Sequence, residues 1–213
     1  MYVPSHFKED RPEVLQDIIR KTGLAVLVSM TSDGLLASHV PLLLDPEPAP
    51  YGTLIGHFAR QNPHGRVTHA DAPESLAIFQ GPEGYITPSW YATKQETGKV
   101  VPTWNYVAVH AYGRLQITED PDRLLAIVTR LTDRHEAGRP EPWAVSDAPA
   151  DYVQRMLKGF VGFVLPIARL EGKVKMSQNR PPVDQQGVVA GLAASGRQDL
   201  AAQVAQVARL PRT

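Results

Sequence analysis

Hydrophobic residues in this chain recur mostly in short runs of the length and alternation expected of β-strands, and at helical spacing in residues 12–21 and 121–134. Strands are expected at residues 24–30, 35–45, 52–58, 74–81, 104–118 and 160–177. Helices are expected at residues 12–21, 121–134, 150–158 and 183–210. Because most strands are joined by turns of hairpin length, this order predicts an antiparallel barrel decorated by helices and not a doubly wound parallel sheet.

Glycine and proline residues are expected to limit where these strands can continue. A turn is predicted at Gly81, Pro82 and Gly84, after which a short extension follows at residues 85–87. Gly113 is expected to mark a bend or a close approach between two backbones. Pro166 removes one amide donor, so the last long strand is predicted to be an edge strand or a bulged strand.

Composition and charge exclude several kinds of chemistry. The 213 residues include 22 basic and 22 acidic side chains, so a protein that simply coats DNA is not expected. There are 0 cysteines, which excludes disulfides, thiolate metal sites and thiol nucleophiles. No apolar run reaches the ~18 residues of a membrane span, and the N-terminus lacks a signal-peptide pattern. We therefore expect a cytoplasmic protein without a membrane segment.

Polar side chains gather on two neighbouring predicted strands. The strands at 35–45 and 52–58 are expected to bring four of them within reach of one anion: Ser38, His39, His57 and Arg60. A guanidinium, hydroxyl and imidazole donors, and a glycine that allows close backbone approach suit the phosphate of a flavin or nucleotide. Each histidine taken singly is better explained as a half-buried strand residue. Asn62 before Pro63, taken alone, is better explained as a turn residue.

The histidines do not predict a metal site. His39, His57, His64 and His69 have no carboxylate at helical spacing beside them, and the chain has no thiol. A second polar group is more informative, because the segment 85–106 combines Trp90 and Trp104 with hydroxyls, amides and lysines. Such a segment suits a planar ligand, whose faces stack on the rings. A dimer interface would have the same composition, and the two interpretations are compatible.

A cationic and amide cluster follows near the end of the last predicted strand. Lys173 and Lys175 share one face of that strand, and Gln178, Asn179 and Arg180 come directly after it. This cluster could hold a phosphate or a nucleic acid. A solvated edge strand protected by lysines explains the pattern equally well, so its role is left open.

Six segments occur here in an order that resembles one known family. They are MYVPSHF, SHVPLLLD, LIGHFARQNP, YITPSWY, VPTWNYVAVHAYG and EGKVKMSQNRP. In this combination the chain is similar, from residue 1 to about residue 182, to the PaiB family of FMN-binding negative transcriptional regulators. The resemblance implies a mainly β fold with helices, the antiparallel FMN-binding split β-barrel, as a homodimer. Residues 1–182 would form this domain, and residues 183–213 a helical tail packed on the same domain or on its partner.

The resemblance also implies FMN as the cofactor and a set of contacts for it. The expected FMN contacts are Ser38, His39, Val40, Gly56, His57, Arg60 and Asn62, with Trp90, Lys94, Trp104 and Asn105 approaching from the other wall or the other subunit. No catalytic residue is implied, because a flavin carries its own electron chemistry.

A flavin-linked sensor that represses transcription is the expected function. A protein partner or DNA would be its target, although no helix-turn-helix, basic recognition helix or zinc finger is visible. An FMN-dependent oxidoreductase, of the flavin reductase or pyridoxamine-phosphate oxidase kind, is the alternative. A haem-handling split barrel ranks below both, because the 7 histidines do not single out an axial ligand.

Overall fold

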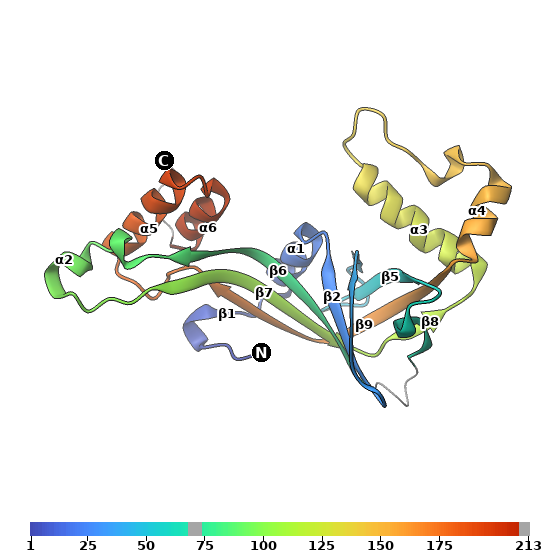
Figure 1. Ribbon diagram of the computed structural model, residues 1–213, viewed down its shortest axis with the longest axis horizontal. Coiled ribbons are helices and arrows are strands. Elements are labelled where there is room, and N and C mark those ends of the chain that lie inside the picture. The colour runs from blue at the N-terminus through green and yellow to red at the C-terminus, as the bar shows by residue number, and fades with distance from the viewer. Residues whose placement is uncertain (68–73, 209–213) are drawn as a thin grey trace. The chain divides into compact units, whose positions relative to one another are not determined.

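The computed structural model describes residues 1–67 and 74–208 (Figure 1). His69 and the last residues of the expected helical tail therefore lie outside the described part. The contacts divide the chain into two compact units. Unit 1 comprises Met1–Asp10, Gln80–Val109 and the chain from Glu171 onward, and unit 2 comprises Arg11–Phe79 and His110–Leu170.

The described residues form nine strands, six α-helices and four short 3-10 helices. The strands are β1 (Lys8–Glu9), β2 (Ala25–Thr31), β3 (Gly34–Val40), β4 (Leu43–Asp45), β5 (Thr53–Ala59), β6 (Ser75–Ile86), β7 (Thr103–Gly113), β8 (Gln116–Thr118) and β9 (Phe160–Lys175). The helices are α1 (Pro12–Lys21), α2 (Thr93–Thr97), α3 (Pro121–Glu136), α4 (Ala150–Leu157), α5 (Pro182–Ala194) and α6 (Gln198–Ala208). The 3-10 helices are η1 (Ser5–Phe7), η2 (Pro63–Arg66), η3 (Pro88–Trp90) and η4 (Val145–Asp147).

The strands form a mainly antiparallel sheet, as the hydrophobic pattern predicts. The hydrogen-bonded order is β3-β2-β6-β7-β9-β5-β4, with β1 and β8 also paired to β9. In unit 2 this order closes on itself, because β3, at one end, contacts β5, the second strand from the other end, as well as its neighbour β2. This contact turns the sheet of unit 2 into a barrel, with Leu27, Phe79 and Phe163 in its fully buried core.

Helices cover the barrel of unit 2 at β4 and β5. Helix α1 contacts β4, and α3 contacts β5. Asp120 caps α3 by accepting a hydrogen bond from the amide of Arg123 at 2.9 Å. One face of α3 then buries Ile127 and Leu131 against Ile55 of β5, which explains the apolar stripe in the sequence of this helix. None of the helices in the described residues is long and apolar enough to cross a membrane.

The expected helical tail forms two helices, α5 and α6, that contact each other within unit 1. Their buried side chains include Val188, Leu192 and Val204. Helix α5 also lies against η3, because a Cβ atom at Gly187 would be 1.9 Å from the carbonyl oxygen of Trp90. The many small residues of the tail therefore allow close helix packing.

The turn expected at Gly81, Pro82 and Gly84 is wrong, because β6 runs through all three residues. Both glycines instead make room for side chains. A Cβ atom at Gly81 would lie 3.0 Å from the Cβ of Val107, and one at Gly84 would lie 2.7 Å from Leu200. These glycines are therefore required for close packing within unit 1 and not for a change of chain direction.

The two remaining expectations about strand ends have different outcomes. The close approach at Gly113 is confirmed, because a Cβ atom there would be 2.2 Å from the carbonyl oxygen of Pro166. The edge position expected for Pro166 is wrong, because β9 pairs with β5 and with β8 in unit 2. Pro166 lies opposite Thr53, in the terminal pair of the β5–β9 register. The strand expected at 35–45 is divided into β3 and β4.

Candidate functional site

The end of β3 and the start of η2 form a hydrogen-bonded group in unit 2. Ser38 Oγ lies 2.7 Å from Nδ1 of His64, and Asn62 Nδ2 donates to Ser38 Oγ at 3.0 Å. Asn62 Oδ1 accepts from the backbone amide of His64 at 3.0 Å and so caps η2. Two of the predicted FMN contacts, Ser38 and Asn62, are therefore brought together, with His64 as a third member.

His64 is the residue of this group that was not among the predicted FMN contacts; the sequence suggested it only as one of four histidines that do not predict a metal site. Its ring is fully buried and stacks on Phe58 at 5.3 Å, and Phe58 stacks in turn on Phe163 at 4.3 Å. Burial lowers the pKa of His64, so the neutral ring is favoured. Its Nε2 is buried and forms no hydrogen bond with the described residues. The signal that could have identified His64 is the capping asparagine two positions before it.

His57 lies on the other face of β5. Its neighbour Gly56 faces the barrel core, because a Cβ atom there would be 2.8 Å from both Leu42 and Phe163. Consecutive residues of a strand point to opposite faces, so His57 points away from this core, where its ring meets Phe160 edge-on at 4.9 Å. Burial lowers the pKa of His57, and its Nδ1 has no hydrogen-bond partner among the described residues. Side-chain packing accounts for Gly56 without any ligand.

Arg60 connects the end of β5 to the chain around α4. Its Nε donates to the carbonyl of Lys158 at 2.7 Å, and its Nη2 donates to the carbonyl of Phe160 at 3.0 Å. Its Nη1 forms an ion pair with Glu119 at 2.7 Å. A guanidinium has five N–H donors, so two of them are left by these three contacts. The side chain is 42% exposed, and these donors can still reach an oxyanion.

His39 and Val40 lie on opposite sides of β3, as strand alternation predicts. Val40 is buried, whereas His39 is exposed and belongs to the outward side of the sheet. We call this side the β2–β3 face; it consists of Val26, Val28, Met30, Leu35, Ala37, His39, Leu76 and Ile78, which are paired across β3, β2 and β6. Met30 is 54% exposed and Leu35 is 72% exposed, so the chain leaves apolar side chains of this face uncovered.

The other predicted FMN contacts belong to unit 1. They are Trp90, Lys94, Trp104 and Asn105. Trp90 packs against α5, and Trp104 donates its indole N–H to Glu83. Asn105 is fully buried, and its Nδ2 donates to Ser177 Oγ at 2.9 Å. Lys94 is exposed on α2. The three residues other than Lys94 therefore have structural contacts within unit 1.

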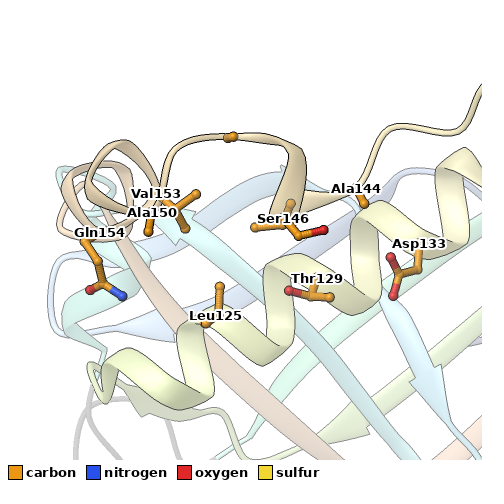
Figure 2. Close-up of a pocket in the computed structure, with 10 residues that line it drawn as sticks. Leu125, Thr129, Asp133, Ala144, Ser146, Ala150, Val153 and Gln154 are labelled. Atoms are coloured by element: carbon orange, nitrogen blue, oxygen red, sulfur yellow. The ribbon is translucent and has the colours of Figure 1, made fainter.

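A separate cleft of about 550 Å³ opens in unit 2 between α3 and the η4–α4 segment (Figure 2). Its walls include Leu125, Thr129, Asp133, Ser146 and Val153. None of the predicted site residues lines it. The described residues also contain no group of three or more His, Asp or Glu side chains arranged to hold a metal ion.

Comparison with known proteins identifies the family. Residues 1–169 match the family described as "Putative FMN-binding domain". Over 189 residues the chain is 32% identical to "Protease synthase and sporulation protein PAI 2" of Bacillus subtilis, covering 89% of this chain and 87% of that protein. The chain belongs to the PaiB family of FMN-binding proteins. This PaiB-family chain is also 36% identical over 225 residues to a protein of Emericella nidulans, covering 90% of each.

Solved structures similar to this PaiB-family chain have much lower sequence identity. The FAD and heme binding protein from Mycobacterium smegmatis has a TM-score of 0.59 and 15% identity, covering 79% of this chain and 73% of that one. The flavocytochrome Anf3 from Azotobacter vinelandii has a TM-score of 0.58 and 13% identity, covering 82% and 72%. At these identities the likeness shows the fold alone, and that fold is the split barrel.

The buried histidines predict that this PaiB-family chain loses stability in acid. The pKa values of His57 and His64 are lowered from 6.5 by burial, so the unfolded chain binds protons that the folded chain does not. The resulting stability is complete above pH 6.5 and is lost as the pH falls from there toward the lowered pKa values. Urea titrations at several pH values would measure this loss. It should be smaller in His64→Gln and unchanged in His135→Gln, which alters an exposed histidine. Equal pH dependence of the unfolding free energy in the unaltered protein and in both variants would contradict the assignment of this loss to His64.

Proposed function

We propose that this chain binds FMN at the end of β3 and on the β2–β3 face, and that it acts as a flavin-linked negative regulator of transcription. The observation that carries the proposal is the family match over residues 1–169. The matched range contains both polar segments, the one around Ser38 and the one from Gly56 to Asn62. The regulatory part of the proposal rests on the resemblance to the PaiB family, and the similarity to "Protease synthase and sporulation protein PAI 2" supports membership of that family.

Residues at the ends of β3 and β5 have the donors that a phosphorylated flavin requires. Arg60 has two N–H donors beyond its present contacts, and a guanidinium pairs well with a phosphate. His39 is exposed and can donate from its ring. His64 has a ring nitrogen without a partner beside Asn62, so this group has unused hydrogen-bonding capacity.

The β2–β3 face fits the flat ring of a flavin. Val26, Val28 and Ile78 lie side by side in the register of β2 and β6 and are half-buried. Aliphatic side chains of this kind pack against an aromatic ring and exclude water from it. Bound FMN would supply electron transfer and visible absorbance, whereas the chain would contribute the phosphate contact at Arg60, the donor at His39 and the dry surface.

We propose that two copies of the chain pair through the β2–β3 face. Exposed apolar side chains on one side of a sheet, such as Met30 and Leu35, are typical of a surface that another chain covers. A twofold axis would let the same face of each copy cover the other. A flavin on this face would then lie between the two subunits.

We further propose that repression works through a protein partner and not through direct reading of DNA bases. Helices α5 and α6 contain no lysine or arginine, so they lack the phosphate contacts that hold a recognition helix on DNA. A flavin-dependent change at the subunit interface could alter how the dimer binds that partner. Retention on DNA that weakens linearly with the logarithm of salt concentration would contradict this part of the proposal.

Replacing Arg60 is expected to weaken FMN binding by about tenfold to a hundredfold, the usual value of a charge-assisted phosphate contact. The measurement is quenching of FMN fluorescence by purified protein, after absorbance and mass analysis of any flavin that co-purifies. Arg155→Ala is the control, because Arg155 is exposed and forms an ion pair with Asp151, one helical turn away. The midpoint of urea unfolding is also measured for each variant. An unchanged midpoint means that weaker FMN binding reflects a lost ligand contact, whereas a lower midpoint means that the substitution has loosened α4.

Two outcomes would contradict the proposed function. One is a protein that purifies without flavin and does not bind added FMN. The other is Arg60→Ala protein with unchanged FMN affinity, which would move the phosphate elsewhere. Bleaching of bound flavin by NADH or NADPH would instead favour the FMN-dependent oxidoreductase, and a haem spectrum would favour the haem-handling alternative.

A further inference from the structure

Three cations of unit 1 have no part in the proposed function. We call Lys173, Lys175 and Arg180 the cationic cluster. Lys173 is only 7% exposed, so its ammonium group lies within the structure. It donates to the carbonyl of Tyr2 at 3.2 Å, and it lies 5.1 Å from the ring of Tyr106 and 5.5 Å from that of Tyr2. Lys173 is therefore a buried charge and not a solvated lysine that protects a strand edge.

Lys175 lies on the same strand, two residues further on. Its ammonium group donates to Thr103 Oγ1 and, at 2.6 Å, to the carbonyl of Trp104. Burial lowers the pKa of Lys175, and the positive charges of Lys173 and Arg180 lower it further. The positive charges of Lys173 and Arg180 therefore both act on the ammonium group of Lys175.

Arg180 completes the cluster from the turn after β9. Its guanidinium lies 4.5 Å from the centre of the Tyr91 ring. Tyr91 is 2% exposed, and its hydroxyl oxygen is buried without a hydrogen-bond partner among the described residues. A buried hydroxyl beside a guanidinium has donor capacity that the chain itself leaves unused.

No carboxylate of the described residues forms an ion pair with the cationic cluster. Glu171, two residues before Lys173, pairs with the N-terminal amine. Asp184 is fully buried and accepts from the amide and the hydroxyl of Thr93, at 3.0 and 2.7 Å. Carbonyl oxygens and aromatic rings compensate the buried positive charge only in part. A buried cation without an anion is unfavourable, so an anion from outside the chain would stabilise this arrangement.

We propose that the cationic cluster is a binding site for a phosphate monoester group of a small ligand. Lys173 uses one of its three ammonium donors and Lys175 uses two, so both can still donate. Arg180 adds the planar donor set that phosphate oxygens prefer. Three positive charges match a phosphate dianion better than a single carboxylate. This proposal does not depend on the proposed function, since it concerns residues outside the β2–β3 face.

The test uses the full chain, freed of flavin, with inorganic phosphate as the probe. Calorimetric titration at constant ionic strength is expected to show saturable phosphate binding that weakens about tenfold or more in Lys175→Met and Arg180→Met. Lys99→Met is the matched control, because Lys99 is an exposed lysine of the same unit. Equal affinity in Lys175→Met and Lys99→Met proteins would overturn the proposal.

A second measurement needs no variant and therefore does not depend on its folding. Competitive acetylation of the wild-type protein, read by peptide mass, reports the reactivity of each lysine amine. Phosphate is expected to slow the acetylation of Lys175 several-fold without affecting that of the exposed Lys99. An unchanged rate at Lys175 in saturating phosphate would overturn the proposal.

Further titrations distinguish the source of the phosphate group. Riboflavin and FMN differ only in the phosphate, so a loss of FMN affinity alone in Lys175→Met would assign the site to the flavin phosphate. If the Lys175→Met protein keeps its FMN affinity but no longer binds inorganic phosphate, the cationic cluster is assigned to another phosphorylated ligand. Binding of duplex DNA that depends on the cluster, without any binding of inorganic phosphate, would overturn the proposal. Phosphate binding by a chain that does not bind FMN would contradict only the proposed function.

Discussion

Replacing Gly187 by alanine is expected to destabilise the chain by about 3 kcal/mol, the upper end of what overpacking costs. The added Cβ would lie 1.9 Å from the carbonyl oxygen of Trp90 and 3.1 Å from its carbonyl carbon. Both are backbone atoms, so no side-chain rotation can relieve the contact. Helix α5 would have to move away from η3. Urea unfolding followed by circular dichroism and tryptophan fluorescence would measure the loss.

The sign of the change in the free energy of unfolding shows whether packing or helix propensity dominates at Gly187. Alanine favours a helix over glycine by about 1 kcal/mol, so propensity alone predicts that Gly187→Ala stabilises α5. Gly23→Ala serves as the control, because nothing lies within 4 Å of a Cβ atom at Gly23. A stabilised Gly187→Ala protein would mean that α5 does not lie against Trp90.

Placing a carboxylate at the centre of the β2–β3 face is expected to give a monomer with at least about a hundredfold weaker FMN binding. Ala37 is exposed and pairs with Val28, so Ala37→Glu should leave the folded chain intact. In a twofold dimer each substitution occurs twice, and both carboxylates would be removed from water without partners. Sedimentation velocity would measure the oligomeric state, and FMN fluorescence the affinity.

A matched substitution on another surface provides the control for this experiment. Ala202 is exposed on α6, so Ala202→Glu adds the same charge away from the β2–β3 face. It is expected to have the oligomeric state and FMN affinity of the unaltered protein. A dimer that persists in Ala37→Glu, or a monomer in the unaltered protein, would exclude this face as the subunit interface.

Local sequence patterns were enough to predict most of the fold. The helix at α1 follows from apolar spacing, and the hairpin of β2 and β3 follows from the turn between two apolar runs. The path of β6 could not be predicted in this way. Gly81 and Gly84 are typical turn residues, but here they make room for Val107 and Leu200, which are distant in sequence. Composition cannot distinguish a glycine that turns the chain from one that another element packs against.

The candidate site was predictable only where its geometry is local. The alternation of β3 separates Ser38 from His39, and this separation is confirmed by their burial. The role of His64 depends on stacking with Phe58, and the burial of Lys173 depends on Tyr2 and Tyr106. Both depend on contacts between segments that no single-sequence pattern relates. The predicted FMN contacts therefore stay predictions until binding is measured.

The turn after β9 has one further consequence for any ligand of Arg180. Ser177 adopts a positive φ of 62°, and its hydroxyl is hydrogen-bonded to buried Asn105. Gln185 donates to the carbonyls of Ser177 and Arg180 at 3.3 and 2.8 Å. The backbone that presents the guanidinium is thus already ordered before an anion arrives. Association would then cost little conformational entropy, and a phosphorylated ligand could bind without a slow rearrangement of this turn.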